Sequence, residues 1–218
     1  MLRGFALGAL LLAACASPLP EYARPSGKVG SLDGLKTGNL IRYRTLTRAD
    51  FLGSEPPPQV GAHRASLGAA TCGLVGPSES SQIAVMPSGD GFTGFMPELR
   101  FEAWMDRDCS WWNPDFDRTS PEYVLEHEQI HFAIFELHAR RLNAEAADIV
   151  RELRAHGATP QAAAAAVQAR FQVRIRKALD GVLAQSQAFD EDTSMSANAA
   201  RQAEWARRIE AELAASAP

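Results

Sequence analysis

Two histidines four residues apart, with a glutamate directly after the first, form the part of this chain best suited to chemistry. The run reads His127-Glu128-Gln129-Ile130-His131. On an α-helix, residues i and i+4 lie on the same face, so both imidazoles can bind one metal ion. Glu128 lies about 100° around the helix from His127, where it can reach a water on the metal but is not placed as a ligand. The spacing predicts a zinc site with a water-activating carboxylate; the alternative is a chance pair of histidines on a core helix.

The flanking sequence predicts that this motif lies on a long helix. Ser120 suits an N-cap, Pro121 the first helical position and Glu122 the first turn. Apolar residues then recur at helical spacing until Gly157 ends the run. Because H-E-x-x-H on a helix is the pattern of zinc peptidases, we expect the protein to hydrolyse peptide bonds.

A catalytic zinc site needs a third protein ligand, and the motif helix cannot easily supply it. His138 shares a face with His131 but lies about 10 Å along the axis, far beyond a metal–ligand bond. If the next helix runs antiparallel, the chain returns to the level of His127 just before an acidic cluster. Asp190 is then the first candidate ligand and Glu191 the alternative, unless these acids only cap a third helix.

The first residues indicate export and attachment to a membrane. Arg3 precedes a short apolar stretch, Phe5–Ala13, which is far below membrane-spanning length. Leu12-Ala13-Ala14-Cys15 then fits a bacterial lipobox, in which Cys15 is acylated; cleavage after Ala16 is the alternative. We therefore expect a signal peptide over residues 1–14 and a lipoprotein of the bacterial cell envelope that faces the periplasm.

Cysteine usage agrees with export. The chain has three cysteines, so acylation of Cys15 leaves Cys72 and Cys109 as a possible pair. In an oxidising compartment we expect these two to form a disulfide, with two buried free thiols as the alternative. Neither has a cysteine or histidine neighbour at the spacing of a zinc finger.

Composition limits the partners and the number of domains. The net charge is −4, from 22 Lys and Arg against 26 Asp and Glu, and the absence of a basic cluster argues against nucleic acid. No second apolar segment has the length of a membrane span, so we expect membrane contact through the N-terminal lipid only. Residues 15–38 are rich in proline and glycine and indicate a tether, and residues 39–218 indicate a single domain.

Residues 39–115 have the alternation of a β-rich part. The clearest run is Leu99–Met105, where apolar and polar residues alternate. Weaker strand candidates are residues 41–45, 69–75 and 82–86. A strand at Leu99–Met105 is a candidate to hold an extended substrate along its edge. Trp111 and Trp112 are expected to pack against the motif helix, with a substrate-binding wall as the alternative.

Residues 119–218 are expected to form three helices. The first carries the motif and ends near Gly157, and the second begins at Pro160 and ends near Gln187. The third spans roughly residues 197–214. Strands followed by segregated helices predict an α+β fold, with an antiparallel β-rich half before a three-helix half that carries the motif.

Several segments resemble a known family. The run Leu125-x-His127-Glu128-Gln129-x-His131-Phe132, followed by Glu136-Leu137 and Ala139-Arg140, is similar to the predicted bacterial secreted zinc-dependent proteases called domain of unknown function 922. So are the upstream run Leu46-Thr47-Arg48-Ala49-Asp50-Phe51-x-Gly53 and the downstream Phe189-Asp190-x-x-Thr193 and Gln202-x-x-Trp205. The resemblance covers about residues 40–213 and implies a zincin-like metallopeptidase.

The chain departs from this family at one place. Met195-Ser196 stands where the family usually has His-Gly. If that histidine is the third ligand in relatives, this chain has lost it, because a thioether is a poor ligand for zinc. Asp190 then takes the role, or the site binds zinc weakly.

The expectation from sequence is a lipid-anchored zinc (Zn2+) metallopeptidase that acts on peptide or protein substrates. His127, His131 and Asp190 hold the metal, and Glu128 is the general base. Tyr123 is the nearest phenol that could stabilise an oxyanion. The alternative is a non-catalytic envelope lipoprotein that retains the helix as a metal-binding or structural element.

Overall fold

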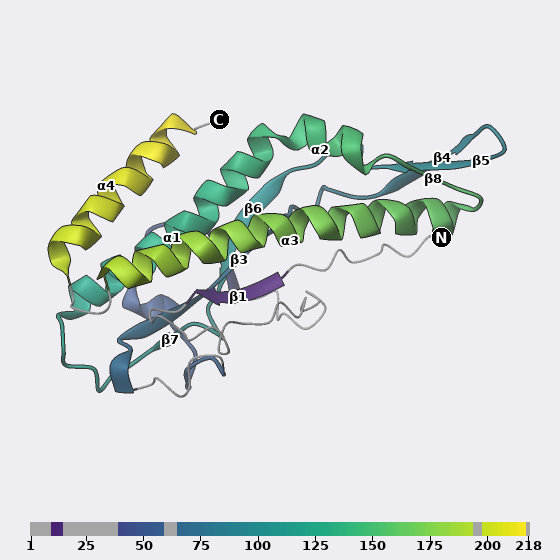
Figure 1. Ribbon diagram of the computed structural model, residues 1–218. Helices are drawn as coiled ribbons and strands as arrows, with labels where there is room; N and C mark the ends of the chain where they lie inside the picture. The colour runs from purple at the N-terminus through teal and green to yellow at the C-terminus, as the bar shows by residue number, and fades with distance from the viewer. Residues whose placement is uncertain (1–9, 15–38, 59–64, 194–197, 217–218) are drawn as a thin grey trace.

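The computed structural model describes residues 10–14, 39–58, 65–193 and 198–216. These ranges form a mixed α/β structure with two antiparallel sheets and four helices, with most strands before the helices (Figure 1). The strands are β1 (Leu10–Ala14), β2 (Leu40–Arg42), β3 (Ala69–Pro77), β4 (Ala84–Ser88), β5 (Gly91–Phe95), β6 (Phe101–Asp106), β7 (Trp111–Trp112) and β8 (Ala155–Gly157). The helices are α1 (Pro121–Ala144), α2 (Ala146–Leu153), α3 (Pro160–Thr193) and α4 (Ala199–Ala215).

The first sheet has the strand order β1-β3-β6-β2, and β7 also pairs with β3. All nine residues of β3 are buried. The motif helix α1 packs across β3 and β6. Gly73 allows this close approach, because a Cβ at that position would lie 2.5 Å from the Phe135 ring. The motif helix is therefore held directly against β3.

The strand predicted at Leu99–Met105 is β6, and it lies inside the first sheet. It pairs with β3 on one side and with β2 on the other. Residues 104 and 105 are therefore paired with neighbouring strands on both edges. In this part of the strand the suggestion that its edge holds an extended substrate is wrong, and along residues 101–103 it stays a prediction.

The second sheet, in the order β4-β5-β8, forms an arm at one end of the molecule (Figure 1). The sequence analysis does not predict β5 or β8, because both contain glycine and β8 follows a helical pattern. Gly157 packs so tightly that a Cβ would lie 2.4 Å from the Ala163 nitrogen, and one on Gly94 would lie 2.7 Å from the Ala163 carbonyl oxygen. The second sheet therefore packs on α3 through close contacts between backbone atoms. Because glycines make these contacts, the sequence of the strands has no apolar periodicity that would predict them.

The helical part has four helices where the sequence predicts three, because the first one breaks at Glu145. Just before the break, the Asn143 side chain accepts a hydrogen bond from Phe101 N at 2.7 Å and donates one to Phe101 O at 2.9 Å. This ties the end of α1 to β6. Ile149 and Leu153 of α2 still pack into the core, so the apolar spacing continues across the break and conceals it.

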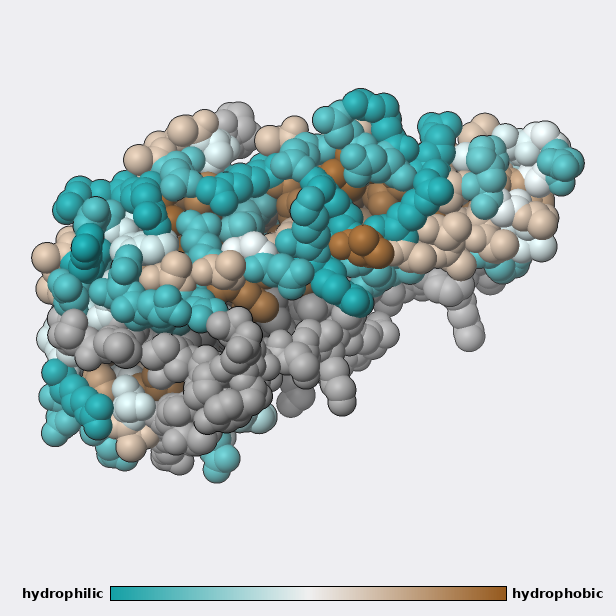
Figure 2. All heavy atoms as spheres, in the orientation of Figure 1, coloured by the Kyte–Doolittle hydropathy of each residue, from teal (hydrophilic) through white to brown (hydrophobic). Residues whose placement is uncertain are grey.

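Helix α3 returns the chain to the motif. Its buried residues recur every three or four positions and include Val167, Phe171 and Ile175. The sequence predicts an end near Gln187, but the helix continues to Thr193. Hydrophilic side chains cover much of the upper half of the face in Figure 2, whereas these apolar residues of α3 pack in the core. Among the described residues, no helix has the length and apolar character of a membrane span.

Strand β7 consists of the two tryptophans at positions 111 and 112. Trp111 is buried, and the Trp112 ring packs edge-on against Phe51 with centroids 5.6 Å apart. Trp112 and Val124 also line a small cavity of about 60 Å³ at the start of α1. The residues around this cavity do not include the predicted metal ligands. Packing beside α1 is therefore the observed role of these tryptophans.

Strand β1 lies inside the segment predicted to be a signal peptide, and it pairs antiparallel with β3. Cys15 and the predicted tether at residues 15–38 lie outside the described residues. The lipid anchor therefore remains a prediction.

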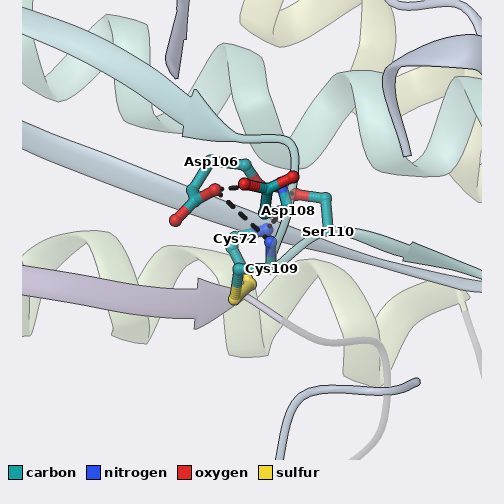
Figure 3. Close-up of a disulfide and its surroundings, with 5 residues drawn as sticks. All are labelled: Cys72, Asp106, Asp108, Cys109 and Ser110. Atoms are coloured by element: carbon teal, nitrogen blue, oxygen red, sulfur yellow. Dashed lines mark hydrogen bonds between the residues drawn. A yellow bond between two sulfur atoms is a disulfide. The ribbon is translucent and has the colours of Figure 1, made fainter. Parts of the chain in front are cut away.

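Cys72 and Cys109, the pair expected from the sequence, form a disulfide (Figure 3). The bond joins β3 to the turn after β6, with the two Cα atoms 5.7 Å apart. The Asp106 carboxylate accepts hydrogen bonds from the backbone of Asp108 at 3.0 Å and Cys109 at 3.3 Å. The Ser110 hydroxyl accepts one from Cys72 N at 2.9 Å. These links fix β3, the strand against which the motif helix packs.

Replacing both Cys72 and Cys109 with alanine should lower the free energy of unfolding by about 3 kcal/mol, because the bond restricts the unfolded chain. The bonded residues are 37 positions apart, a loop long enough for a measurable effect. Urea denaturation of the two proteins measures the difference. Peptide mapping without reductant should show the two peptides linked, and alkylation of both thiols in native, unreduced protein would contradict the bond.

Candidate metal centre

Three buried side chains from two helices meet at one point. His127 Nε2 lies 3.1 Å from Asp190 Oδ1, and His131 Nε2 lies 2.9 Å from the same oxygen. The two Nε2 atoms are 3.2 Å apart. Their exposed fractions are 5% for His127, 0% for His131 and 2% for Asp190. The structure therefore brings together the three residues that the sequence analysis puts forward as metal ligands.

The geometry of this cluster suits a metal ion. Zinc binds nitrogen and oxygen ligands at about 2.0–2.1 Å in a tetrahedral arrangement, which places ligand atoms roughly 3.3 Å apart. The three distances in the cluster run from 2.9 to 3.2 Å. Two imidazole nitrogens and one carboxylate oxygen also form a ligand set used by catalytic zinc sites. The three side chains can therefore bind a metal ion.

The charges within the cluster favour a cation. Burial lowers the pKa of His131, but the adjacent Asp190 carboxylate outweighs burial, so the net shift is upward. Burial raises the pKa of Asp190, but the two histidines outweigh it and the net shift is downward. Both shifts describe a buried carboxylate that needs a positive partner. A proton on His131 can supply that charge, and a bound metal ion would replace it.

The start of α1 has the cap that the sequence predicts. The Ser120 hydroxyl accepts a hydrogen bond from Tyr123 N at 3.3 Å, and Pro121 occupies the first helical position. The Tyr123 hydroxyl donates to Thr193 O at 3.2 Å, which links the first turn of α1 to the end of α3. The two helices are therefore joined one turn before His127.

Gln129, the middle residue of the motif, binds an upstream segment and takes no part in the metal cluster. Its Oε1 accepts a hydrogen bond from Leu46 N at 2.6 Å, and its Nε2 donates to Arg44 O at 3.3 Å. The Arg44 guanidinium in turn binds the buried Asp50 carboxylate at 2.6 Å. Burial raises the pKa of Asp50, but the hydrogen bond from Arg44 contributes to a net shift downward. This network ties residues 44–50 to the motif helix.

Glu128 is buried beside the ligands without being one of them. Its side chain is 1% exposed, and among the described residues its Oε2 has no hydrogen-bond partner. Burial raises the pKa of Glu128, and the charges of His131 and His127 oppose that shift. The hydroxyl of Thr71, on β3, also acts to lower the Glu128 pKa, but among the described residues its Oγ1, like Glu128 Oε2, makes no hydrogen bond. A buried carboxylate oxygen without a partner is costly, so this atom suits contact with a water or a substrate.

Helix α4 contributes a contact that the sequence analysis does not predict. Gln202 is fully buried, and its Oε1 lies 3.2 Å from His127 Nδ1. Its Nε2 donates to Tyr123 O at 3.1 Å and to Glu126 Oε2 at 2.8 Å. The available signal is a glutamine in the apolar stripe of α4, one turn before Trp205.

Phe189 is a second unpredicted neighbour of the metal ligands. It is fully buried, and its ring stacks on His127 with centroids 4.4 Å apart. Its edge contacts the His131 ring at 5.0 Å. Because it directly precedes Asp190, α3 places an apolar wall and a ligand side by side. The wall keeps water from one side of the cluster, which strengthens the interactions of its charges.

The other two acids at the end of α3, Glu191 and Asp192, point away from the metal cluster. Glu191 is exposed and accepts a hydrogen bond from Gln187 at 2.8 Å. Asp192 accepts one from Trp205 Nε1 at 2.8 Å. The N-cap of α4 is Asn198, so the alternative in which these acids cap a third helix that starts from Thr193 or Ser196 is wrong. Glu191 is therefore not brought to the histidines, whereas Asp190 is.

Two further residues considered in the sequence analysis lie away from the cluster or outside the described residues. His138 Nε2 lies 2.9 Å from Gln185 Oε1, so this histidine links α1 to α3 at a distance from the metal ligands. Met195-Ser196, where the chain departs from the family pattern, falls outside the described residues.

Comparisons of the chain with protein family models, with curated proteins and with solved structures returned no match. The resemblance to domain of unknown function 922 therefore remains a prediction from the motif segments. The site is interpreted from its own geometry.

Replacing Asp190 with alanine should weaken zinc binding by more than about 100-fold, because the change removes a direct ligand. The matched control is Glu191→Ala, the neighbouring acid on the exposed side of the same helix turn, which should leave zinc affinity within about twofold of wild type. Competition with a chromophoric chelator measures both affinities. Wild-type affinity in Asp190→Ala would eliminate Asp190 as a ligand, and a selective loss in Glu191→Ala would transfer the role to that residue.

Proposed function

We propose that this protein is a zinc-dependent peptidase of the bacterial cell envelope. The observation that carries the proposal is the position of Glu128, a buried acid with an unpaired oxygen next to a cluster of two histidines and one aspartate. His127, His131 and Asp190 hold the metal. With these three ligands, a bound ion would keep a coordination position for water and substrate, as in catalytic zinc sites.

A bound zinc ion supplies a more acidic water and polarises a carbonyl oxygen. The chain's own residues do the rest of the chemistry. Glu128 accepts a proton from the water as it attacks the peptide carbonyl carbon, and then delivers that proton to the leaving amine nitrogen. Burial raises the pKa of Glu128, the direction that suits a carboxylate which takes up a proton and gives it away again.

The number and chemistry of the ligands support a catalytic site over a structural one. Structural zinc sites are usually closed by four protein ligands, commonly cysteines. The described residues supply three ligands, and both Cys72 and Cys109 are engaged in their disulfide. A structural site would also have no use for Glu128, whose burial without a hydrogen bond for Oε2 is unfavourable.

The proposed location and substrate follow from the sequence. A lipobox at Cys15 supports a lipoprotein that faces the periplasm, and the motif supports peptide or protein substrates.

A non-catalytic, metal-binding lipoprotein is the second candidate. The burial of the cluster favours it, since His127 and Asp190 are only 5% and 2% exposed. A buried metal ion would stabilise the packing of α1 on α3 without meeting a substrate.

Replacing Glu128 with glutamine separates the two candidates. The variant should retain zinc, because Glu128 is not a ligand, and should cleave peptides at least about 100-fold more slowly, which is the usual contribution of a general base. Elemental analysis and cleavage of a peptide library measure the two properties in the same purified protein. The control is Glu122→Gln, the same change at an exposed position of α1, which should leave both properties unchanged.

Equal cleavage by wild type and Glu128→Gln would show that Glu128 is not the base. Zinc binding without cleavage by any of the three proteins would favour the non-catalytic lipoprotein.

A further inference from the structure

We infer that Gln202 is a positioning residue that sets the tautomer of His127 for metal binding. The inference rests on the metal site proposed above and adds a residue from a third helix to it. Gln202 does not touch the metal position; it contacts the far nitrogen of the His127 ring. Its role is therefore to determine which ring nitrogen carries hydrogen.

The orientation of the Gln202 amide follows from its partners. Its Nε2 lies 3.1 Å from the Tyr123 carbonyl oxygen and 2.8 Å from Glu126 Oε2. A carbonyl and an ionised carboxylate only accept hydrogen bonds, so the NH2 group must face them. The amide oxygen must then face His127 Nδ1, 3.2 Å away. The surrounding network thus excludes the flipped amide.

The fixed amide oxygen determines the state of the His127 ring. An amide oxygen only accepts hydrogen bonds, so Nδ1 must carry the hydrogen that it donates to Gln202. In a neutral imidazole, Nε2 then keeps a lone pair. That lone pair is directed at the cluster, because Nε2 is the atom that lies 3.1 Å from Asp190 and 3.2 Å from His131 Nε2. His127 is therefore ready to bind a cation before one arrives.

Without Gln202, the same surroundings would favour the wrong tautomer. Among the described residues, Asp190 Oδ1 and His131 Nε2 would remain near Nε2 of the ring, and the carboxylate would attract a hydrogen there. An Nε2 that carries hydrogen cannot bind metal. The amide and the aspartate thus compete for the single ring hydrogen of His127, and metal binding requires that the amide wins.

The position of Gln202 in its helix supports a role beyond packing. The buried residues of α4 are Gln202, Trp205, Ile209 and Leu213, at the spacing of an apolar stripe. A leucine or methionine at position 202 would fill this stripe at less desolvation cost than a buried amide. Burial of the amide becomes favourable because its oxygen and its nitrogen both form hydrogen bonds, with His127, Tyr123 and Glu126.

His131 provides an internal contrast. Its Nδ1 is buried and, within the described part of the chain, has no hydrogen-bond partner. No acceptor therefore holds hydrogen on Nδ1 of His131, and Asp190 Oδ1 lies 2.9 Å from its Nε2, whereas Gln202 holds hydrogen on Nδ1 of His127. Of the two imidazole ligands, His127 is the one preorganised by protein contacts.

The test compares full-length wild-type protein with Gln202→Met, which keeps the side-chain length and removes both polar atoms. Zinc affinity, measured by chelator competition, should fall about 10- to 100-fold, as expected for loss of a partner that orients a ligand. Long-range 1H–15N spectra of the metal-free proteins report the tautomer directly. They should show hydrogen on His127 Nδ1 in the wild type and a shift towards Nε2 in the variant.

The matched control is Asn143→Leu, because Asn143 also makes two hydrogen bonds between α1 and a neighbouring element but lies three turns beyond His131. It should lower the thermal midpoint without changing zinc affinity or the His127 tautomer. An equal loss of zinc affinity in both variants would overturn the inference, since it would reflect general destabilisation. Unchanged affinity or an unchanged tautomer in Gln202→Met would overturn it as well.

Glu126→Ala decides the question if Gln202→Met does not fold, because Glu126 is exposed and its loss only frees one hydrogen of the amide. Zinc affinity should fall a few-fold and the Nε2–H form of His127 should gain population, with the thermal midpoint unchanged; no change in either property would overturn the inference. A wild type that binds no zinc but has hydrogen on His127 Nδ1 would refute the proposed metal site while leaving the amide's control of the tautomer intact.

Discussion

One carboxylate held between two imidazoles in the interior is the interaction on which the arrangement of the helices depends. Asp190 is almost completely buried, and an isolated buried carboxylate is strongly unfavourable unless positive charge and hydrogen bonds compensate it. His127 and His131 supply that compensation through a shared proton or a shared metal ion. If α3 ended near Gln187, the carboxylate could not reach the histidines, and the two helices would lose this buried polar contact.

The motif helix can serve this cluster because its other contacts fix its position. Gly73 lets α1 approach β3 closely, and the Cys72–Cys109 disulfide anchors β3 one residue earlier. Gln129 binds the segment between β2 and β3 from another side of the same helix. With α1 held this way, the two histidines meet α3 while Glu128 lies beside Thr71 of β3. One helix thus presents the candidate metal ligands to α3 and Glu128 to β3.

The cluster is a small polar network in an apolar surrounding. Phe189 covers both imidazoles, and Trp205 packs against Phe189 from α4 with ring centroids 5.4 Å apart. In such an environment electrostatic interactions are stronger than in water, and each unsatisfied group is more costly. The unpaired oxygen of Glu128 is therefore the group most in need of a functional explanation, which the proposed peptidase chemistry provides.

The sequence by itself determined the features that depend on neighbours along the chain: the paired histidines, the Ser120 cap, the apolar face of α3 and the choice of Asp190 from the length of a helical hairpin. Apolar periodicity and capping residues indicate which face of a segment is buried. The cysteine count and the expected oxidising compartment favour one disulfide. Only the tertiary structure decided what lies opposite each face. It placed β6 inside the sheet, formed β5 and β8 from glycine-containing segments, and broke the first helix at Glu145. It also brought Gln202 to His127 across 75 positions. A buried amide in an apolar stripe has no local signal of its partner, because the hydrogen bonds that make its burial favourable exist only after α4 has packed on α1.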